Sequence, residues 1–173
     1  YVPTARITSS YNTGLVSAEI LYAGGLIGFS ATANITSSYN TGSVMAGSDY
    51  AGGLVGYAMN RSEFNFSYNT GSVSASRFVA GGLDGYVNRA GIKSSHNTGT
   101  VSVGNYGAGG LVGYVEAEAN ITSAYNTGSV SEADRIGGLI GLGKGVIYAS
   151  FNSGAIAASA SSFGTGGLIG DAG

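Results

Sequence analysis

The chain repeats one pattern six times, and this repetition constrains its fold more than any other feature. Each unit contains an aromatic residue followed by Asn, Thr (Ser153 in the sixth unit) and Gly, and further along the segment Gly-Gly-Leu-x-Gly. The first motif starts at Tyr11, Tyr39, Tyr68, His96, Tyr125 and Phe151, and the second at Gly24, Gly52, Gly81, Gly109, Gly137 and Gly166. The second motif recurs every 28 or 29 residues. A fixed period of this length is typical of a solenoid in which each repeat stacks on the next.

Three apolar columns appear when the six units are aligned on the aromatic residue. Four residues before it stand Ile7, Ile35, Phe64, Ile92, Ile121 and Ile147. Five residues after it stand Val16, Val44, Val73, Val101, Val130 and Ile156. The two glycines of the second motif are followed by Leu26, Leu54, Leu83, Leu111, Leu139 and Leu168. Alternation of apolar and polar residues around the first column, and β-branched residues in the second, predict short strands rather than helices.

These columns predict an all-β fold, a β-solenoid (parallel β-helix) of about six coils of 28–29 residues with three short strands per coil. The apolar columns should form its interior, and residues 1–173 should form one domain. We expect the turn glycines, of which Gly14 is the first, to adopt a positive φ angle. Because the pattern is already under way at Tyr1 and still present near Gly173, we expect the chain to be a piece of a longer protein.

The asparagine of each turn defines a further column. Side-chain amides stacked in register can hydrogen-bond the neighbours above and below them, so we predict a structural amide ladder. Its members are Asn12, Asn40, Asn69, Asn97, Asn126 and Asn152.

Composition excludes several function classes. The seven Lys and Arg residues are outnumbered by nine Asp and Glu, which gives a net charge of −2 and argues against nucleic acid as a partner. The chain has no cysteine and one histidine, so thiolate chemistry and multi-histidine metal sites are excluded, and we expect no cofactor. No apolar stretch reaches the roughly 20 residues that cross a bilayer, so we expect no membrane insertion.

The tetrapeptides Gly-Leu-Ile-Gly, Gly-Leu-Val-Gly and Gly-Leu-Asp-Gly, each following a Tyr-Asn-Thr-Gly-like turn, resemble the GLUG repeat family of bacterial surface and secreted proteins. The resemblance spans nearly the whole chain, with departures at Asp84, at His96 and at Phe151 with Ser153. Members of the family include streptococcal surface proteins and metalloproteases that cleave immunoglobulin A, in which the repeats lie outside the catalytic domain. The resemblance implies an extracellular or cell-surface display or adhesion module without catalytic residues.

An outward-facing stripe is the first candidate for a partner surface. If the Leu column faces inward, strand alternation should turn the residues one and three positions further outward, and Asp84 in the same row supports that orientation. The candidate stripe consists of Ile27, Phe29, Val55, Tyr57, Tyr86, Val112, Tyr114, Ile140, Leu142 and Ile169. It could contact a protein or glycan partner, or pack under a neighbouring domain.

Acidic residues give a weaker signal. Glu116 and Glu118 lie near one another in sequence, as do Glu132 and Asp134, and these acids could bind calcium or simply line solvated loops. A polysaccharide-active enzyme would need two or three acids, or a Lys and Arg cluster, on one outer face. His96 is expected to pack as a ring in the turn column.

We therefore expect a non-catalytic structural or interaction module that acts as a rigid stalk, an adhesion face or a unit of a fibre. End-to-end or lateral self-association is expected, because the end coils expose unpaired strand edges. An ice- or crystal-surface-binding solenoid is an alternative, since Thr13, Thr41, Thr70, Thr98 and Thr127 form one regular file. A polysaccharide-active β-helix enzyme is a third.

Overall fold

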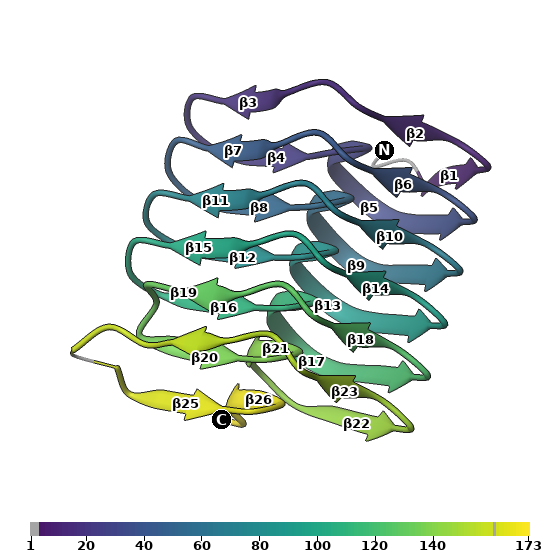
Figure 1. The fold of residues 1–173 in the computed structure, drawn as a ribbon. Helices are drawn as coiled ribbons and strands as arrows, with labels where there is room; N and C mark the ends of the chain where they lie inside the picture. Colours follow the sequence, from purple (N-terminus) through teal and green to yellow (C-terminus); the bar gives the residue numbers. More distant parts are fainter. Residues whose placement is uncertain (1–3, 161) are drawn as a thin grey trace.

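The computed structural model describes residues 4–160 and 162–173, and in that part of the chain it contains strands and no helix. The strands wind into a β-solenoid whose successive coils lie one above the other (Figure 1). Neighbouring coils pair in parallel. The predicted all-β solenoid of about six coils is thus confirmed. No helix that could span a membrane occurs among the described residues.

Four parallel sheets, here named A to D, run along the solenoid. Sheet A has the longest strands: β1 (Thr4–Thr8), β5 (Ile27–Thr36), β9 (Val55–Asn65), β13 (Asp84–Lys93), β17 (Val112–Thr122), β21 (Ile140–Leu142) and β26 (Ile169–Asp171), with β22 (Gly145–Tyr148) also paired to β17. Sheet B has two-residue strands: β2 (Tyr11–Asn12), β6 (Tyr39–Asn40), β10 (Tyr68–Asn69), β14 (His96–Asn97), β18 (Tyr125–Asn126) and β23 (Phe151–Asn152).

The other two sheets complete each coil. Sheet C contains β3 (Val16–Ala18), β7 (Val44–Ala46), β11 (Val73–Ala75), β15 (Val101–Val103), β19 (Val130–Ser131) and β24 (Ile156–Ala157). Sheet D contains β4 (Tyr22–Gly24), β8 (Tyr50–Gly52), β12 (Val79–Gly81), β16 (Gly107–Gly109), β20 (Arg135–Gly137) and β25 (Gly164–Gly166). Each coil therefore has roughly the three predicted strands, in sheets C, D and A, and the two-residue strand of sheet B at the predicted turn.

The predicted apolar columns form the interior. Ile35 pairs in register with Phe64, and Phe64 with Ile92, and all three side chains are at most 1% exposed. Leu54, Leu83, Leu111 and Leu139 are fully buried, as is Val44 of sheet C. Burying such a side chain contributes about 1.5–3 kcal/mol, so a stack of these columns is a large stabilising term.

The interior is divided into two apolar clusters. One lies under sheet A and includes the Leu column, and the other lies between sheets C and D. Except at Gly167, the glycine before each Leu meets a turn asparagine in the interior: a Cβ placed on Gly53 would lie 2.0 Å from the Gly82 carbonyl oxygen and 2.5 Å from Cγ of Asn69. Only glycine fits there, which explains why the two sequence motifs occur together in every unit.

The alternation between 28 and 29 residues has a structural cause in sheet A. Strands β9 and β17 have 11 residues, whereas β5 and β13 have 10. The pairing of β9 with β13 shifts by one residue after Val87, so that Met59 and Asn60 lie opposite Asn88. The extra residue is a β-bulge on the outer face, and the register recovers for the rest of the strand.

The positive φ angles do not lie where the sequence predicts them. Gly14 and its equivalents in the other turns have ordinary φ angles, and the Gly at this position is required by close stacking, since a Cβ on Gly42 would lie 2.0 Å from the carbonyl oxygen of Gly14. The left-handed residues instead end the sheet A strand two positions before the aromatic. They are Ser9, Ser37, Phe66, Ser94, Ser123 and Ala149, with φ between 47° and 51°; outside this column, Glu132 has a φ of 69°.

Candidate functional site

The predicted asparagine ladder is present. Each Asn Nδ2 donates to the Oδ1 of the next Asn toward the C-terminus, at 2.8–2.9 Å, from Asn12 through to Asn152. The same Nδ2 also donates to the carbonyl oxygen of the turn glycine two residues later, at 2.7–3.0 Å. The four central members are fully buried. The ladder is therefore a structural element that no ligand can reach between its ends.

A second ladder, not predicted from the sequence, runs beside it. The residue before each turn aromatic is serine in five units, and its hydroxyl donates to the carbonyl oxygen two residues earlier. The same hydroxyl accepts a bond from the corresponding backbone N–H of the preceding coil, as in Ser38 N–H to Ser67 Oγ at 3.2 Å. Ala124 interrupts this row. The recurrence of Ser one position before the aromatic was the signal that could have revealed it.

The turn aromatics form a stack on the outside of sheet B. Neighbouring rings from Tyr11 to Phe151 lie 4.6–5.3 Å apart with interplanar angles of 2–7°. His96 lies in this stack between Tyr68 and Tyr125, as predicted, and burial lowers its pKa. Because the ring faces cover one another, the stack presents mainly ring edges to solvent.

The predicted outward stripe is only half correct. Val55, Val112 and Ile140 are fully buried, Leu142 is 9% exposed, and Ile27 and Ile169 are partly buried against the core cluster, so the aliphatic half of the stripe faces inward. The Leu column lies in a bend between sheets D and A, and strand alternation does not continue across a bend. The amides of Leu54 and Val55 both donate to the Leu83 carbonyl, which marks this turn of the backbone.

Asp84 lies in the same inward row, which reverses the orientation expected for it. It pairs in register with Val55 and Val112, is fully buried, and neither carboxylate oxygen has a hydrogen-bond partner. Burial raises the pKa of Asp84 well above its ordinary value of 3.8, and the neighbouring Ser62 hydroxyl acts in the opposite direction. The side chain is therefore a buried carboxyl group that lies near the Ser62 hydroxyl but has no hydrogen-bond partner.

The aromatic half of the stripe does face outward and belongs to a larger surface, the aromatic strip. Rings from sheet A and from the start of sheet D contact one another at 4.5–6.5 Å, many of them tilted or edge-on. Its members are Tyr22, Phe29, Tyr50, Tyr57, Phe78, Tyr86, Tyr106 and Tyr114. Phe29 is 45% exposed and the other seven are half-buried. The rings from sheet D were not predicted because they do not share one column of the aligned units. Tyr22 and Tyr50 stand in one column, and Phe78 and Tyr106 stand one position earlier.

The hydroxyl groups of Tyr50, Tyr57, Tyr86 and Tyr114 stay protonated at neutral pH. Burial, with a smaller effect of nearby charges, raises the pKa of Tyr50 to about 12, and burial also raises the pKa values of Tyr57, Tyr86 and Tyr114. Tyr86 donates to Glu116 at 2.7 Å, and this bond together with one from Asn88 lowers the pKa of Glu116. The strip thus offers apolar ring surface with neutral hydroxyl donors and acceptors, a combination that is common at recognition surfaces.

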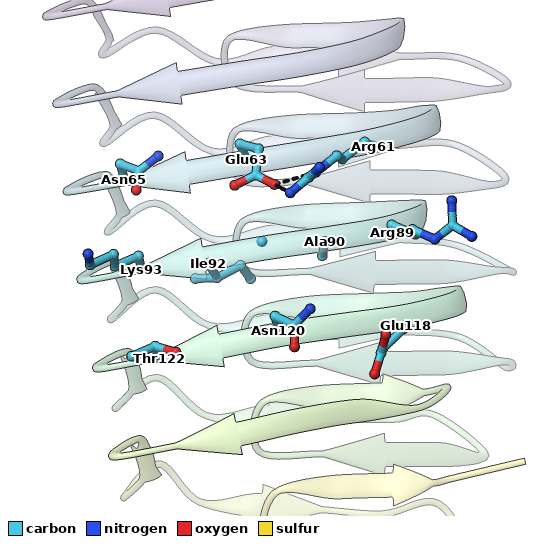
Figure 2. A pocket seen from close by; sticks show the side chains of 11 residues that line it. Arg61, Glu63, Asn65, Arg89, Ala90, Ile92, Lys93, Glu118, Asn120 and Thr122 are labelled. Carbon is cyan, nitrogen blue, oxygen red and sulfur yellow. Dashed lines mark hydrogen bonds and ion pairs between the residues drawn. The ribbon is translucent and has the colours of Figure 1, made fainter.

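A polar hollow of about 470 Å³ lies on the outer face of β9, β13 and β17, in the second half of these strands (Figure 2). Gly91 stands in register between Glu63 and Asn120 and contributes no side chain, so the surface is depressed there. Arg61 forms an ion pair with Glu63. The remaining charged groups are Arg89, Lys93 and Glu118, which surround the depression. Apart from Glu118, which was considered as a calcium ligand, none of these was predicted as part of a site, although counting the 28- or 29-residue period brings Arg61, Arg89 and Glu118 into one file.

The acids considered for catalysis or calcium do not come together. Glu116 on β17 accepts hydrogen bonds from Tyr86 and Asn88 of β13, whereas Asp134 lies in the connection between β19 and β20, where its backbone N–H donates to the Asn105 carbonyl oxygen. Among residues 4–160 and 162–173, no three His, Asp or Glu side chains gather closely enough to hold a metal ion.

A comparison with protein families matches the family described as the GLUG motif at residues 21–45 and 104–131. Two segments of the chain therefore match the GLUG motif. No curated protein and no solved structure matches the chain. The first GLUG match runs through β4, β5, β6 and into β7, and the second through β16, β17, β18 and β19, so each match covers one passage through all four sheets.

The GLUG signature is therefore explained by the interior of the solenoid. Its two glycines and Leu form the bend between sheets D and A, and its Tyr-Asn-Thr-Gly turn supplies the amide that packs against the second of those glycines. The outward residues of the aromatic strip and of the polar hollow vary between GLUG units. A repeat pattern can reveal the scaffold in this way, whereas the features of the outer face differ from coil to coil.

Proposed function

We propose that this GLUG-repeat chain is a rigid, non-catalytic module of a cell-surface or secreted protein, and that the aromatic strip is its interaction face. The observation that carries the proposal is the extent of the strip, which presents rings from four successive coils on one side of the rod. A contiguous exposed aromatic surface is typical of protein or glycan contact sites.

Rigidity supports a role in holding that face in place. Every interior coil is hydrogen-bonded to the coils above and below through four sheets, and the asparagine and serine ladders add side-chain bonds in the same direction. Such a stack bends little, because bending would stretch several rows of hydrogen bonds at once. The extracellular or cell-surface placement rests on the GLUG match and the family resemblance alone.

The proposal is tested by adhesion of beads that carry the chain to surfaces coated with extracellular matrix proteins or neutral glycans. The triple variant Tyr57→Ser, Tyr86→Ser, Tyr114→Ser removes the centre of the strip, and we expect it to lose at least tenfold in bead retention. The matched control changes three tyrosines of the turn stack, Tyr39, Tyr68 and Tyr125, to Ser. Equal retention by the two folded variants would refute the strip as the interaction face.

Absence of catalysis is part of the proposal and has its own test. Glu116 accepts hydrogen bonds from Tyr86 and Asn88, and these bonds lower its pKa, which favours the ionised form over the protonated form that a general acid needs. We expect no depolymerisation of acidic or neutral polysaccharides by the wild-type chain. Measurable cleavage that disappears in Glu116→Gln or Asp134→Asn would replace this proposal with an enzymatic function.

Self-association along the axis is a further part of the proposal. In the 173-residue chain the ladder ends in an Asn12 oxygen without an Asn donor and an Asn152 amide that donates to no further Asn, so the two ends are complementary. We expect electron micrographs of this polypeptide at micromolar concentration to show end-to-end stacks. Dispersed short rods at every concentration would limit the module to a spacer or adhesive role.

Ice or crystal-surface binding is the second candidate. Thr13, Thr41, Thr70, Thr98 and Thr127 are all exposed and stand in one file beside sheet B, as such a surface requires. The neighbouring row is irregular, because Asn65, Lys93 and Tyr148 interrupt its threonines. Thermal hysteresis at high protein concentration would support this function, and its absence would exclude it.

A further inference from the structure

We propose that the polar hollow on β9, β13 and β17 binds an acidic oligosaccharide, with Arg89 and Lys93 contacting uronate carboxylates and the centre of the hollow contacting hydroxyl groups. This site is separate from the aromatic strip, so its failure would leave the proposed function standing. Both cations are exposed, and within the described part of the chain neither side chain has a hydrogen-bond or ion-pair partner.

The charges of the hollow comprise one ion pair, two cations whose side chains are unpaired, and one acid without an ion pair. Glu63 is paired with Arg61, and its carboxylate lies over Gly91, where a Cβ would be 2.4 Å from Glu63 Oε2. Glu118 stands in register with Arg89 without forming an ion pair. The hollow therefore has a net positive charge on a chain whose overall charge is −2. Arg and Lys without internal partners are available for charge-assisted bonds to carboxylates.

The spacing of the two cations favours a chain over a single small anion. Arg89 and Lys93 are four residues apart on β13, which corresponds to about 13 Å along the strand. Figure 2 shows them at opposite ends of the hollow, with Glu63 and Asn120 between them. One phosphate or sulfate ion could not reach both, whereas a polymer that carries an anionic group at intervals could.

The polar groups between the cations and beside Lys93 suit sugar hydroxyls. Asn120 and Asn65 offer amide donors and acceptors, Thr122 offers a hydroxyl, and the Glu63 carboxylate accepts hydrogen bonds. A shallow, open and polar surface of this kind contacts a polyhydroxylated ligand better than an apolar one. The centre of the hollow thus recognises hydroxyls and its ends recognise carboxylates, both of which a uronic acid polymer provides.

Two other classes of anionic polymer fit less well. β13 is paired on both sides, to β9 and β17, so its backbone offers no free edge to which an acidic peptide could add a strand. Nucleic acid binding depends on several cations clustered against the phosphates, and here Glu63 and Glu118 lie among three cations. Uronate oligosaccharides therefore remain the ligand class that the hollow favours.

The test is isothermal titration of the 173-residue chain with a hexamer of galacturonic acid at low ionic strength, with a neutral glucose hexamer as the uncharged probe. We expect the double variant Arg89→Gln, Lys93→Gln to weaken binding at least tenfold. The control Arg6→Gln, Arg77→Gln removes the same charge from exposed positions outside the hollow and should change affinity less than twofold. Glu118→Gln should tighten binding, because it removes the unpaired acid beside Arg89.

A second variant tests the shape of the hollow without changing charge. Gly91→Gln fills the depression and displaces only the flexible end of Glu63, so it should fold and should weaken binding. Three results would each overturn the proposal: no binding of the acidic hexamer at millimolar concentration, equal losses in the hollow and control double variants, or equal affinity for a glutamate hexapeptide. Melting temperatures of all variants, compared with the wild-type value, verify that each one is folded.

Discussion

Replacing Asp84 should remove a pH-dependent destabilisation of the solenoid. The carboxyl group is fully buried with both oxygens unpaired, between Val55 and Val112 of the adjacent coils. Its pKa is raised by burial in the folded state and is near 3.8 in the unfolded chain. Above pH 3.8 the folded state therefore binds more protons at this site than the unfolded state does. Stability must fall as the pH rises from 3.8 toward the folded-state pKa.

The size of the effect follows from the linkage relation. One proton of difference changes the free energy of unfolding by about 1.4 kcal/mol per pH unit, until the pH reaches the folded-state pKa. In a chain of this length, 1 kcal/mol corresponds to about 2–4 °C in melting temperature. We therefore expect the wild-type melting temperature to fall by roughly 3–6 °C per pH unit relative to Asp84→Val.

Two variants separate the charge from the unpaired polar atoms. Asp84→Val matches the residues above and below it in the column and should be more stable than wild type at every pH, with a gap that widens as the pH rises. Asp84→Asn removes the titration but leaves a buried polar group, so its gap to Asp84→Val should be constant. Thermal unfolding followed by circular dichroism from pH 3 to pH 8 measures all three. Parallel curves for wild type and Asp84→Val would refute the buried, unpaired carboxyl.

Three substitutions in the ladders and corners give further predictions. Asn97→Asp should destabilise the fold by about 2–6 kcal/mol, because the buried Gly99 carbonyl oxygen and the Asn126 Oδ1 both lose their donor. Chemical denaturation measures this change in the free energy of unfolding. Ala124→Ser should add about 0.5–1.5 kcal/mol by giving the Ser95 amide the hydroxyl acceptor found in other coils, and an unchanged denaturation midpoint would argue against the serine ladder. Phe66→Asn should stabilise by about 1 kcal/mol, because Phe66 is 61% exposed at φ 51°, where Asn is better tolerated; a lower melting temperature would show that the ring contributes more than the strain costs.

The interior was predictable from the sequence because it repeats. Ile35 and its column, the Leu column and the asparagine ladder each recur in every unit, and stacking in register is the arrangement that gives every copy the same environment. The prediction did not extend to φ angles. A repeated glycine indicates either a positive φ or a close approach, and at Gly42 the cause is the close approach.

The outer face was predicted less well for two physical reasons. Strand alternation assumes a continuous pleat, and the bend at Leu54 turns Val55 inward although Tyr57, two residues later, faces outward. The hollow depends on residues that differ between units, Arg89 and Gly91 among them, and on the bulges that bring them into register. A sequence pattern averaged over six units does not contain that information.

The asparagine ladder gives the rod a direction. Every amide donates toward the C-terminal neighbour, so the Nδ2 group of Asn40 finds its acceptor only after Asn69 has been placed. A ribosome releases the coils in that same order. Each completed coil consequently has an amide donor for the coil that is synthesised next. The coils can therefore be added one at a time from the N-terminus, each on a neighbour that is already present.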